Sequence, residues 1–435
     1  MDKTTQLLIV GGGFAGTAVA RTLVRRLPPD TRLTLVSEES YTTFNPMLPE
    51  AVGASIFPEQ VVAPLRELLP PGMACDFVMG RVSAIDTQAR TLACETLAGT
   101  RQVRWDHLVL AVGVRARLDL IPGMAEHALP LKTAGDALEI RNIVLRRLAR
   151  IELEPDPALR AALGRFVVIG GGFSGTEVAG ELVDCLASIV RYYPRAAVSM
   201  LGVTLLHDGP RLLPELPPRL GAAALASLRR RGVDVRLGCA ATRIEADGVI
   251  LADGTGIASR TVISTIGTRP NPLVASLGLP LERGRLRVRP DLSVDGVPGL
   301  WALGDCAWVP NAHDGQPAPP TAQFAVREGA WLAHNLLAAL RGAPTRPFAH
   351  RSRGAMATIG HQRGVALVAG VPLAGLPAWL LWRAYYLSQM PTLRRKLRIF
   401  VEWTWGMFFP TDITHLRFQR SAALDRPEAP PQGPA

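Results

Sequence analysis

Apolar and polar residues follow the same order in two distant parts of the chain. In residues 7–36, the apolar run LLIV is followed by the turn GGGFAG, by TAVARTLVRRL with apolar residues at helical spacing, and by RLTLV. Residues 166–206 repeat this order with FVVI, GGGFSG, TEVAGELVDCLASIVRYY and VTLL. Each part is predicted to form a strand, a glycine-rich turn, a helix and a second strand, which is the context that a dinucleotide-binding fingerprint requires.

The other apolar runs indicate that the second unit is inserted into the first. FVMGRVSAID and HLVLAVGV close the first unit, TVISTIG closes the second, and LWALGDCA near residue 300 is a strand that returns to the first sheet. We predict an α/β fold with two Rossmann-like dinucleotide-binding domains. The predicted bounds are 1–125 and 291–345 for the first domain, 126–290 for the inserted domain, 346–420 for a C-terminal region with amphipathic helices, and 421–435 for a Pro-rich, disordered tail.

The paired glycine turns indicate that something passes between two dinucleotides. The glycines let the backbone approach a pyrophosphate, and the N-terminus of the following helix offers it N–H groups and a partial positive charge. The simplest pairing is a tightly held flavin and a diffusible nicotinamide, with hydride moving from one ring to the other. A duplicated fold with one vestigial site is less favoured, because both turns are intact.

An acidic residue at the end of the second strand usually binds the ribose of the dinucleotide. In the first unit Glu38 is the candidate, with Ser37 as a helper, and in the second His207 ends the strand and Asp208 follows it. The acid favours the unphosphorylated ribose of NAD, but its displacement by one residue and the nearby Arg211 leave NADP open. A solvated turn is an equally good interpretation of His207.

Composition narrows the chemistry and the location. The 435 residues are 48% hydrophobic and 20% charged, enough apolar material for several packed domains. The five cysteines are scattered, without a CxxC pair or metal-ligand spacing, which argues against a disulfide scaffold, a metal site and a redox disulfide. The first residues lack a signal-peptide pattern, so the body of the protein is expected in the cytoplasm. The formal net charge of +11 calls for an anionic partner.

The segment 373–409 combines aromatic and basic residues. One helical face is predicted to carry Trp379, Trp382, Tyr386 and Met390, and another Leu397, Phe400, Val401, Trp405 and Phe408, with Arg394, Arg395 and Arg398 largely off the second face. This pattern is typical of a helix lying in a membrane interface, whereas prolines and Arg383 interrupt it before the roughly 18 apolar residues of a spanning helix accumulate. A dimerisation helix pair or a core element is the alternative. Because no nucleic-acid reading element is recognisable, the charge points to anionic phospholipid and not to nucleic acid.

The order of GGGFAG, LAVGV, GGGFSGTEVAGEL, STIGTRPN, LWALGDCA and TAQFAVREG resembles that of the type II NADH:quinone oxidoreductases, which are single-subunit, FAD-dependent, non-proton-pumping NADH dehydrogenases. The resemblance extends from residue 7 to about residue 418, and TAQFAVREG and FFPTDI narrow it. It implies that Asp305 bonds the ribityl chain of FAD and that Gln323 lies against flavin and quinone. It also implies that Glu177 lies near the nicotinamide and flavin rings. Arg327 and Glu328 stand where relatives often have glutamine, so their contact with quinone stays open.

The candidate site residues follow from these motifs and from the resemblance. FAD is expected at Gly11, Gly13, Phe14, Ala15, Gly16, Ser37, Glu38, Val82, Ala111, Gly113, Asp305, Ala322 and Gln323. NADH is expected at Gly170, Gly172, Phe173, Ser174, Gly175, Glu177, His207, Asp208 and Gly267. The catalytic candidates are Glu177 and Gln323, and no metal is expected.

These observations predict an enzyme that passes hydride from NADH to FAD and two electrons on to a membrane quinone. It is expected at the cytoplasmic face of the inner (plasma) membrane as a peripheral protein, with a homodimer as a further possibility. One alternative is a soluble NAD(P)H-dependent flavin reductase of a small electron-carrier protein. The other is a non-catalytic flavin-binding membrane or signalling protein.

Overall fold

The computed structural model describes residues 4–69, 75–196, 200–390 and 392–416, so the predicted tail 421–435 lies outside the described residues. The chain divides into two compact units. Unit 1 consists of Met1–Phe44, Val62–Ala116 and Thr268–Arg353, and unit 2 of Asn45–Val61, Arg117–Gly267 and Gly354–Ala435. The predicted domain bounds stay predictions.

Unit 1 is built on a seven-stranded sheet in the order β21-β8-β1-β2-β5-β6-β7. Its strands are β1 (Thr5–Val10), β2 (Thr31–Ser37), β5 (Cys75–Asp86), β6 (Thr91–Thr96), β7 (Gly99–Arg104), β8 (His107–Leu110) and β21 (Leu300–Ala302). β21, β8, β1, β2 and β5 run parallel, and β6 and β7 extend the sheet antiparallel. LWALGDCA thus returns to the first sheet, which confirms that prediction.

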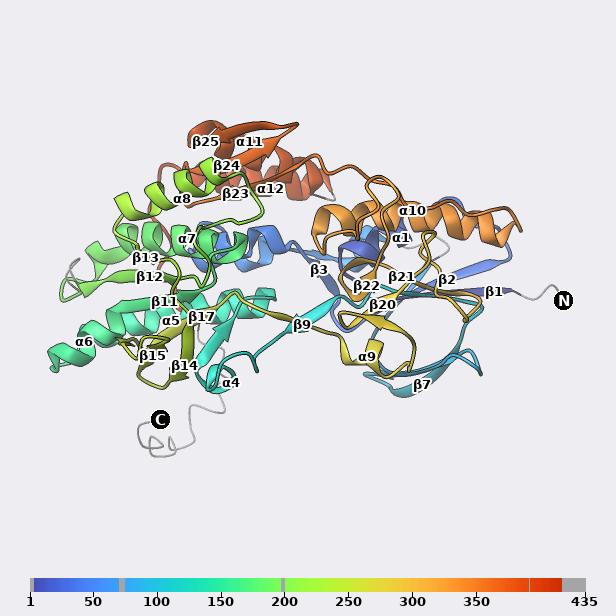
Figure 1. The fold of residues 1–435 in the computed structure, drawn as a ribbon, viewed down its shortest axis with the longest axis horizontal. Coiled ribbons are helices and arrows are strands. Elements are labelled where there is room, and N and C mark those ends of the chain that lie inside the picture. The colour runs from blue at the N-terminus through green and yellow to red at the C-terminus, as the bar shows by residue number, and fades with distance from the viewer. Residues whose placement is uncertain (1–3, 70–74, 197–199, 391, 417–435) are drawn as a thin grey trace. The chain divides into compact units, whose positions relative to one another are not determined.

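Helices α1 (Phe14–Leu23) and α10 (Ala322–Leu340) lie side by side in unit 1 (Figure 1). The apolar strands β1 and β8 are almost wholly buried in its core, as expected for parallel strands covered on both faces. The smaller elements are β3 (Tyr41–Thr43), β4 (Val62–Pro64), α3 (Leu65–Leu68), β9 (Val114–Ala116), β18 (Thr268–Pro270), α9 (Pro272–Ala275), β19 (Leu281–Glu282), β20 (Arg285–Arg287), η5 (Gly304–Cys306) and β22 (Ala307–Trp308).

Unit 2 contains a five-stranded parallel sheet in the order β10-β17-β11-β12-β13. Its strands are β10 (Ala128–Pro130), β11 (Arg165–Ile169), β12 (Gly202–Leu206), β13 (Asp234–Arg236) and β17 (Thr261–Ser264), and the antiparallel β14 (Ala241–Glu245), β15 (Gly248–Leu251) and β16 (Gly256–Ala258) form a second sheet. Its helices are α4 (Met124–His127), α5 (Ala134–Ile151), α6 (Pro157–Gly164), α7 (Phe173–Ile189) and α8 (Pro218–Arg230). Segment 45–61 adds η1 (Asn45–Met47), α2 (Leu48–Val52) and η2 (Pro58–Gln60), and α2 contacts α5 and α7.

The C-terminal part of unit 2 consists of the antiparallel strands β23 (Gly354–Thr358), β24 (Gly364–Val368) and β25 (Val371–Ala374), followed by α11 (Leu376–Gln389) and α12 (Leu393–Trp405). The predicted helical faces are found here: Trp379, Trp382 and Met390 are buried, whereas Leu397, Phe400, Val401, Trp405 and Phe408 are exposed. No helix in the described part of the chain is both long and apolar enough to cross a bilayer.

Candidate functional site

The residues predicted to hold FAD follow the carboxyl ends of four neighbouring parallel strands in unit 1. The glycine turn follows β1, Ser37 ends β2 with Glu38 after it, Ala111 follows β8, and Asp305 lies in η5 just after β21. Ala322 and Gln323 open α10 in the same unit. Ligands bind at this edge of open α/β sheets. All thirteen candidates for FAD therefore lie in unit 1.

The nine candidates for NADH lie in unit 2, where the same rule holds. The second glycine turn follows β11, His207 and Asp208 follow β12, and Gly267 follows β17. These three strands are neighbours in the parallel sheet. Each unit thus has one candidate dinucleotide site at the edge where such sites form.

In the first glycine turn, two glycines are required by close backbone contacts, whereas a third has free space where a side chain would be. Gly11 has φ +115°, and a Cβ there would meet the carbonyl oxygen of Ala111. A Cβ on Gly16 would meet the carbonyl oxygen of Gly11. Gly13 differs, because its φ is −76° and a Cβ would meet no protein atom within 4 Å. The side-chain space at Gly13 is therefore where a pyrophosphate can approach the backbone and the N-terminus of α1.

The second turn repeats this arrangement. Gly170 has φ +118°, and a Cβ there would lie 2.6 Å from Thr265 Oγ1, while one on Gly175 would meet the carbonyl oxygen of Gly170. Gly172, with φ −75°, is open to 4 Å like Gly13. Both turns therefore fit the phosphates of a dinucleotide, and neither is vestigial in its geometry.

Glu38 carries two partners that the sequence did not reveal. Its Oε1 accepts a hydrogen bond from Arg115 Nη2 at 2.7 Å and from Arg81 Nε at 3.5 Å. These arginines come from β9 and β5, so no local pattern links them to Glu38. The carboxylate is held at the strand end while its side chain stays 38% exposed, which leaves an acceptor for a ribose hydroxyl. Ser37 is buried beneath the first turn, against Gly12.

His207 is packed and not solvated, which corrects one of its two interpretations. Its ring lies against Gly171 and its side chain is only 13% exposed. Nδ1 lies 3.1 Å from Asp208 Oδ1, and Asp208 is exposed. Arg211 donates to the carbonyl oxygens of Leu216 at 2.9 Å and Pro214 at 2.6 Å. Arg211, whose position left binding of NADP possible, therefore uses its guanidinium to hold its own loop.

At the start of α10, Glu328 supports the turn that bears Asp305. Glu328 is buried, its Oε2 accepts the N–H of Gly304 at 2.7 Å, and burial raises the pKa of its carboxyl to about 7. Gln323 Oε1 accepts from Ser352 Oγ at 3.3 Å, and Arg327 is exposed. Glu328 thus holds the backbone in place, a role that its position in TAQFAVREG did not reveal.

Glu177 is buried at the start of the second turn of α7, at the position where the first unit has Ala18. Its Oε1 accepts the backbone N–H of Thr358, 181 residues along the chain, at 3.1 Å. Burial raises the pKa of the Glu177 carboxyl well above its ordinary value, and the Thr358 N–H opposes this shift. In the first unit α10 approaches so closely that a Cβ on Gly329 would lie 2.6 Å from Ala18 Cβ. The first helix therefore has no room for a glutamate at this position, whereas the second meets a backbone donor.

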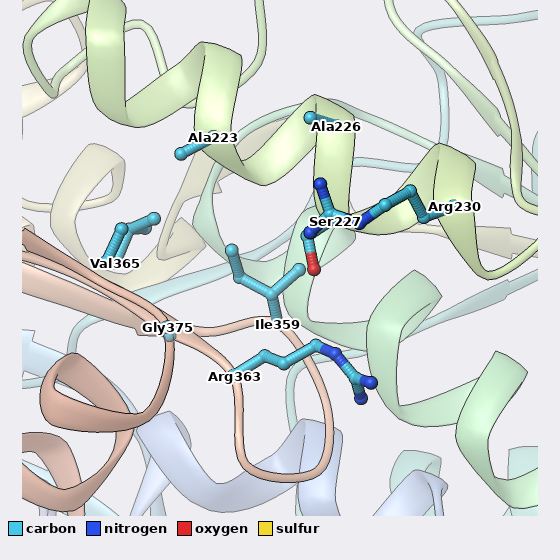
Figure 2. A pocket seen from close by; sticks show the side chains of 10 residues that line it. Ala223, Ala226, Ser227, Arg230, Ile359, Arg363, Val365 and Gly375 are labelled. Atoms are coloured by element: carbon cyan, nitrogen blue, oxygen red, sulfur yellow. The ribbon is translucent and has the colours of Figure 1, made fainter.

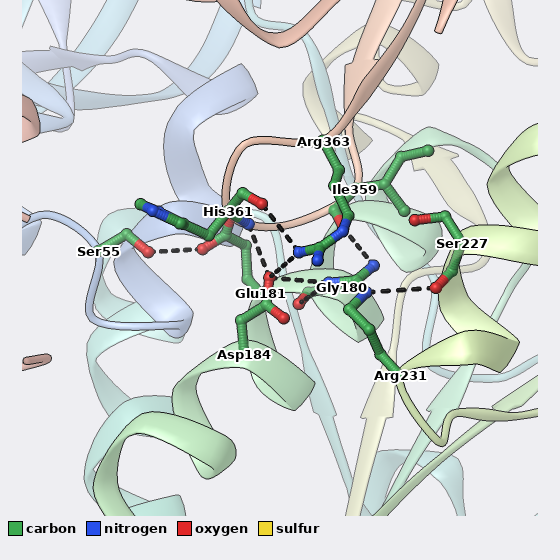
Figure 3. A network of polar contacts seen from close by, with 9 residues as sticks. All are labelled: Ser55, Gly180, Glu181, Asp184, Ser227, Arg231, Ile359, His361 and Arg363. Atoms are coloured by element: carbon green, nitrogen blue, oxygen red, sulfur yellow. Dashed lines mark hydrogen bonds and ion pairs between the residues drawn. The ribbon is translucent and has the colours of Figure 1, made fainter. Parts of the chain in front are cut away.

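The turn between β23 and β24 docks on α7 at two further positions (Figure 3). Gly180 lets the chain pass close, since a Cβ there would lie 2.5 Å from the carbonyl carbon of Ile359. The N–H of His361 donates to Asp184 Oδ2 at 2.7 Å, and Arg231 reaches the same oxygen at 2.7 Å while also bonding the carbonyl oxygen of Ile359. The helix that begins at the second glycine turn is thus fixed by the C-terminal strands.

The five cysteines are free, and burial raises the thiol pKa of four of them, Cys75, Cys94, Cys185 and Cys306, which makes them poor nucleophiles. Burial raises the pKa of the Cys306 thiol to about 11 and those of Cys75 and Cys185 to about 12. The thiolate is the reactive form. In the described residues no group of His, Cys, Asp and Glu is placed to hold a metal ion.

A cavity of about 320 Å³ lies between α8 and the C-terminal strands (Figure 2). Ser227 and Arg230 line it from α8, Ile359 and Arg363 from the turn between β23 and β24, and Val365 from β24. None of the candidate residues for FAD or NADH lines this cavity.

Comparisons with known proteins match nearly the whole chain. Residues 5–329 match the family model described as pyridine nucleotide-disulphide oxidoreductase, and residues 352–412 match the NDH2 C-terminal domain. The type II NADH:quinone oxidoreductase NdhA of Mycobacterium tuberculosis is 30% identical over 93% of this chain and 87% of its own. The demethylphylloquinone reductase NdbB of Synechocystis is 30% identical over 92% of this chain and 96% of its own.

Among solved structures, NDH2 of Plasmodium falciparum in complex with NADH has the same fold. Its TM-score is 0.87 at 17% identity, over 94% of this chain and all of that one. The sulfide:quinone oxidoreductase of Aquifex aeolicus matches with a TM-score of 0.69 at 20% identity, over 92% of each chain.

Proposed function

The chain belongs to the pyridine nucleotide-disulphide oxidoreductase family and, within it, to the type II NADH:quinone oxidoreductases, and we propose that it performs this reaction at an anionic membrane surface. It is an FAD-dependent enzyme that oxidises NADH and reduces quinone without pumping protons. We assign FAD to one unit and NADH to the other because each unit has an intact glycine turn with one open glycine. Each turn lies at the edge of its sheet where ligands bind in such folds.

When bound, FAD supplies the redox chemistry, because its ring accepts a hydride from NADH and returns two electrons to quinone. The chain supplies binding and orientation. The open space at Gly13 and the N-terminus of α1 receive the pyrophosphate of FAD, Glu38 binds its ribose, and Asp305 holds its ribityl chain. Gln323, in the first turn of α10, faces the quinone.

In the second site, Gly172 receives the pyrophosphate of NADH and Asp208 binds its adenosine ribose. The exposed Asp208 carboxylate repels a 2′-phosphate, and Arg211 is engaged with the loop that follows it. Both features favour NADH over NADPH.

Glu177 orients the nicotinamide. Its fixed position, one turn into α7 and held by Thr358, lets a carboxyl bond the carboxamide of the ring without acting as a nucleophile.

The Glu177→Ala variant should keep FAD but be reduced by NADH about 10- to 100-fold more slowly, because a small misplacement of the nicotinamide costs rate on this scale. Rapid-mixing absorbance of the flavin under anaerobic conditions measures this rate. Glu126→Ala, which removes an exposed carboxylate of the same unit, is the matched control and should change nothing. Loss of the yellow colour from Glu177→Ala would instead assign the carboxyl to structure.

The exposed apolar face of α12 is the proposed membrane contact. The residues of this face, Leu393, Leu397, Phe400, Val401 and Trp405, are between 55% and 70% exposed. Just after the helix, Phe408 and Phe409 are 76% and 48% exposed and extend the apolar surface. Contiguous apolar exposure of this kind marks an interaction site. Arg394 and Arg398 are exposed on the same helix, which suits anionic headgroups. A soluble reductase of a small carrier protein would leave this face unexplained.

The proposed location is the cytoplasmic face of the plasma membrane. Quinones are dissolved in the bilayer, so an enzyme lying on its surface meets NADH from the water and quinone from the lipid. The free cysteines suit a reducing compartment. A homodimer through α12 is the competing use of the same face, and the vesicle experiment described in the Discussion separates the two.

A further inference from the structure

Three glutamates are buried together in unit 2, beneath the C-terminal helices. Glu50 on α2 is 1% exposed, and Glu177 and Glu181, four residues apart on α7, are 6% and 3% exposed. Residues four apart on a helix are neighbours on one face. The end of α2 packs directly against Glu181, since a Cβ on Gly53 would lie 2.7 Å from the Cβ of Glu181. These three residues are called the glutamate cluster below.

Each carboxyl of the glutamate cluster has a neutral hydrogen-bond donor. Glu50 Oε2 accepts from Trp403 Nε1 at 3.1 Å, Glu181 Oε2 from Ser55 Oγ at 2.6 Å, and Glu177 Oε1 from the N–H of Thr358 at 3.1 Å. Figure 3 shows Ser55 directed at Glu181. These donors orient the carboxyls but bring no compensating positive charge.

Positive charge is scarce around the glutamate cluster. Among the described residues, one cation lies within 4.0 Å of any of the three carboxyls: Arg383 of α11, whose Nη2 is 4.0 Å from Glu50 Oε1. Arg383 is itself enclosed, with its guanidinium 3.8 Å from the ring centre of Trp379 and 4.8 Å from that of Trp403. One guanidinium cannot balance three buried carboxylates.

The other titratable and charged groups packed around the glutamate cluster do not change this charge balance. They are Asp184 and Cys185 on α7, Arg141 on α5, Tyr386 on α11, Glu402 on α12, and His361 and Arg231 at the docking turn. Arg231 lies 2.7 Å from Asp184, and Arg141 lies 3.8 Å from Asp412. Glu402 adds another carboxyl and accepts the N–H of Phe57 at 2.6 Å.

An unbalanced buried charge costs several kcal/mol, so a carboxyl in such a place takes up a proton instead. Burial raises the pKa of Glu50 to about 7 and that of Glu181 to about 8. The nearby Glu50 carboxylate raises the pKa of Glu181 further, and Arg383 lowers the pKa of both groups. At neutral pH the glutamate cluster therefore holds protons that can leave within the physiological range.

The overall reaction needs such a proton. NADH, one proton and quinone give NAD⁺ and quinol, and the hydride brings two electrons with only one of the two protons that the quinol contains. We propose that Glu181 and Glu50, beside Arg383, store the second proton and release it when quinone is reduced. This inference rests on the proposed function. The O–H bond of a glutamic acid breaks, an O–H bond of the quinol forms, and water then restores the proton to the carboxylate.

The sign of the pH dependence follows from the stored form. The acid is the donor, so quinone turnover should fall as the pH rises through about 7 to 8. Glu181→Gln cannot donate, so its turnover should be at least about 10-fold lower below pH 7 and should lose this alkaline fall. Flavin reduction by NADH without quinone should keep its wild-type rate in Glu181→Gln. Removing the cation in Arg383→Gln should move the alkaline fall to higher pH, which a purely structural role would not do.

Infrared difference spectra test the stored proton without relying on turnover. Protein at acid minus alkaline pH should show the C=O band of a buried carboxylic acid, and ¹³C-labelled glutamate should shift it. Glu181→Gln and Glu50→Gln should each weaken the band, whereas Glu59→Gln, which changes an exposed carboxyl of the same unit, should not. If wild-type protein shows the band but reduces no quinone, the proposed function is wrong, although the buried carboxyls still hold protons. If Glu181→Gln reduces quinone with the wild-type pH profile, or the wild-type band is missing, the inference is wrong.

Discussion

Gly13→Val should yield a folded protein that has lost its flavin. The backbone at Gly13 has φ −76° and ψ −168°, which valine adopts without strain, and a Cβ there meets no protein atom within 4 Å. The added side chain therefore obstructs only the ligand, where the pyrophosphate should approach the backbone. Absorbance of the purified protein measures bound flavin, and circular dichroism measures the fold. We expect less than about a tenth of the wild-type flavin content, because a clash with the pyrophosphate costs several kcal/mol, and binding weakens about tenfold for each 1.4 kcal/mol.

Gly172→Val is the matched variant at the second turn, with φ −75° and the same open space. It should remain yellow while its KM for NADH rises at least about 10-fold for the same steric reason. The two variants together test the assignment of FAD to unit 1 and NADH to unit 2. A Gly172→Val protein without flavin, or a Gly13→Val protein with a normal flavin content, would contradict it.

The double variant Phe400→Asp/Trp405→Asp should bind anionic vesicles about 100-fold more weakly than the wild type. Both side chains lie on the exposed face of α12, at 55% and 61% exposure. Burying one large apolar side chain contributes about 1.5–3 kcal/mol, so removing two costs about 3 kcal/mol or more. Co-sedimentation with phosphatidylglycerol vesicles measures the binding, which should also weaken with salt because of the basic residues on this helix.

The control for this prediction is Leu97→Asp/Leu153→Asp, which changes two exposed leucines, at 90% and 81% exposure, outside the C-terminal helices. It should bind vesicles like the wild type, and both double variants should keep their flavin. If the α12 variant lost dimers while its vesicle binding stayed intact, the face would be a subunit interface and the membrane assignment would be wrong.

The parts of the fold that have a local signal were predictable. Both glycine turns, the return of LWALGDCA to the first sheet and the two faces of the C-terminal helices follow from short apolar patterns, and the structure confirms each of them. The different surroundings of Gly11 and Gly13 were not predictable. The sequence GGG does not show which glycine faces a carbonyl oxygen and which faces open space.

The contacts that explain the individual site residues were not predictable. Glu177 meets Thr358 at a separation of 181 residues, and Glu38 meets Arg115 across 77 residues. Glu50 meets the indole of Trp403 across 353 residues. Such contacts depend on how elements pack, and neither hydrophobic period nor turn chemistry encodes them. The segment FNPMLPEAVGAS, residues 44–55, carries no recognisable motif, yet it contributes Glu50 to the glutamate cluster and the hydroxyl of Ser55 that donates to Glu181.

Mixing the purified protein anaerobically with NADH, and then with a short-chain quinone, tests the central claim most directly. The flavin absorbance should bleach on addition of NADH and recover on addition of quinone, with one quinol formed for each NADH oxidised. A flavin that bleaches but is not restored by quinone at a useful rate would contradict the account.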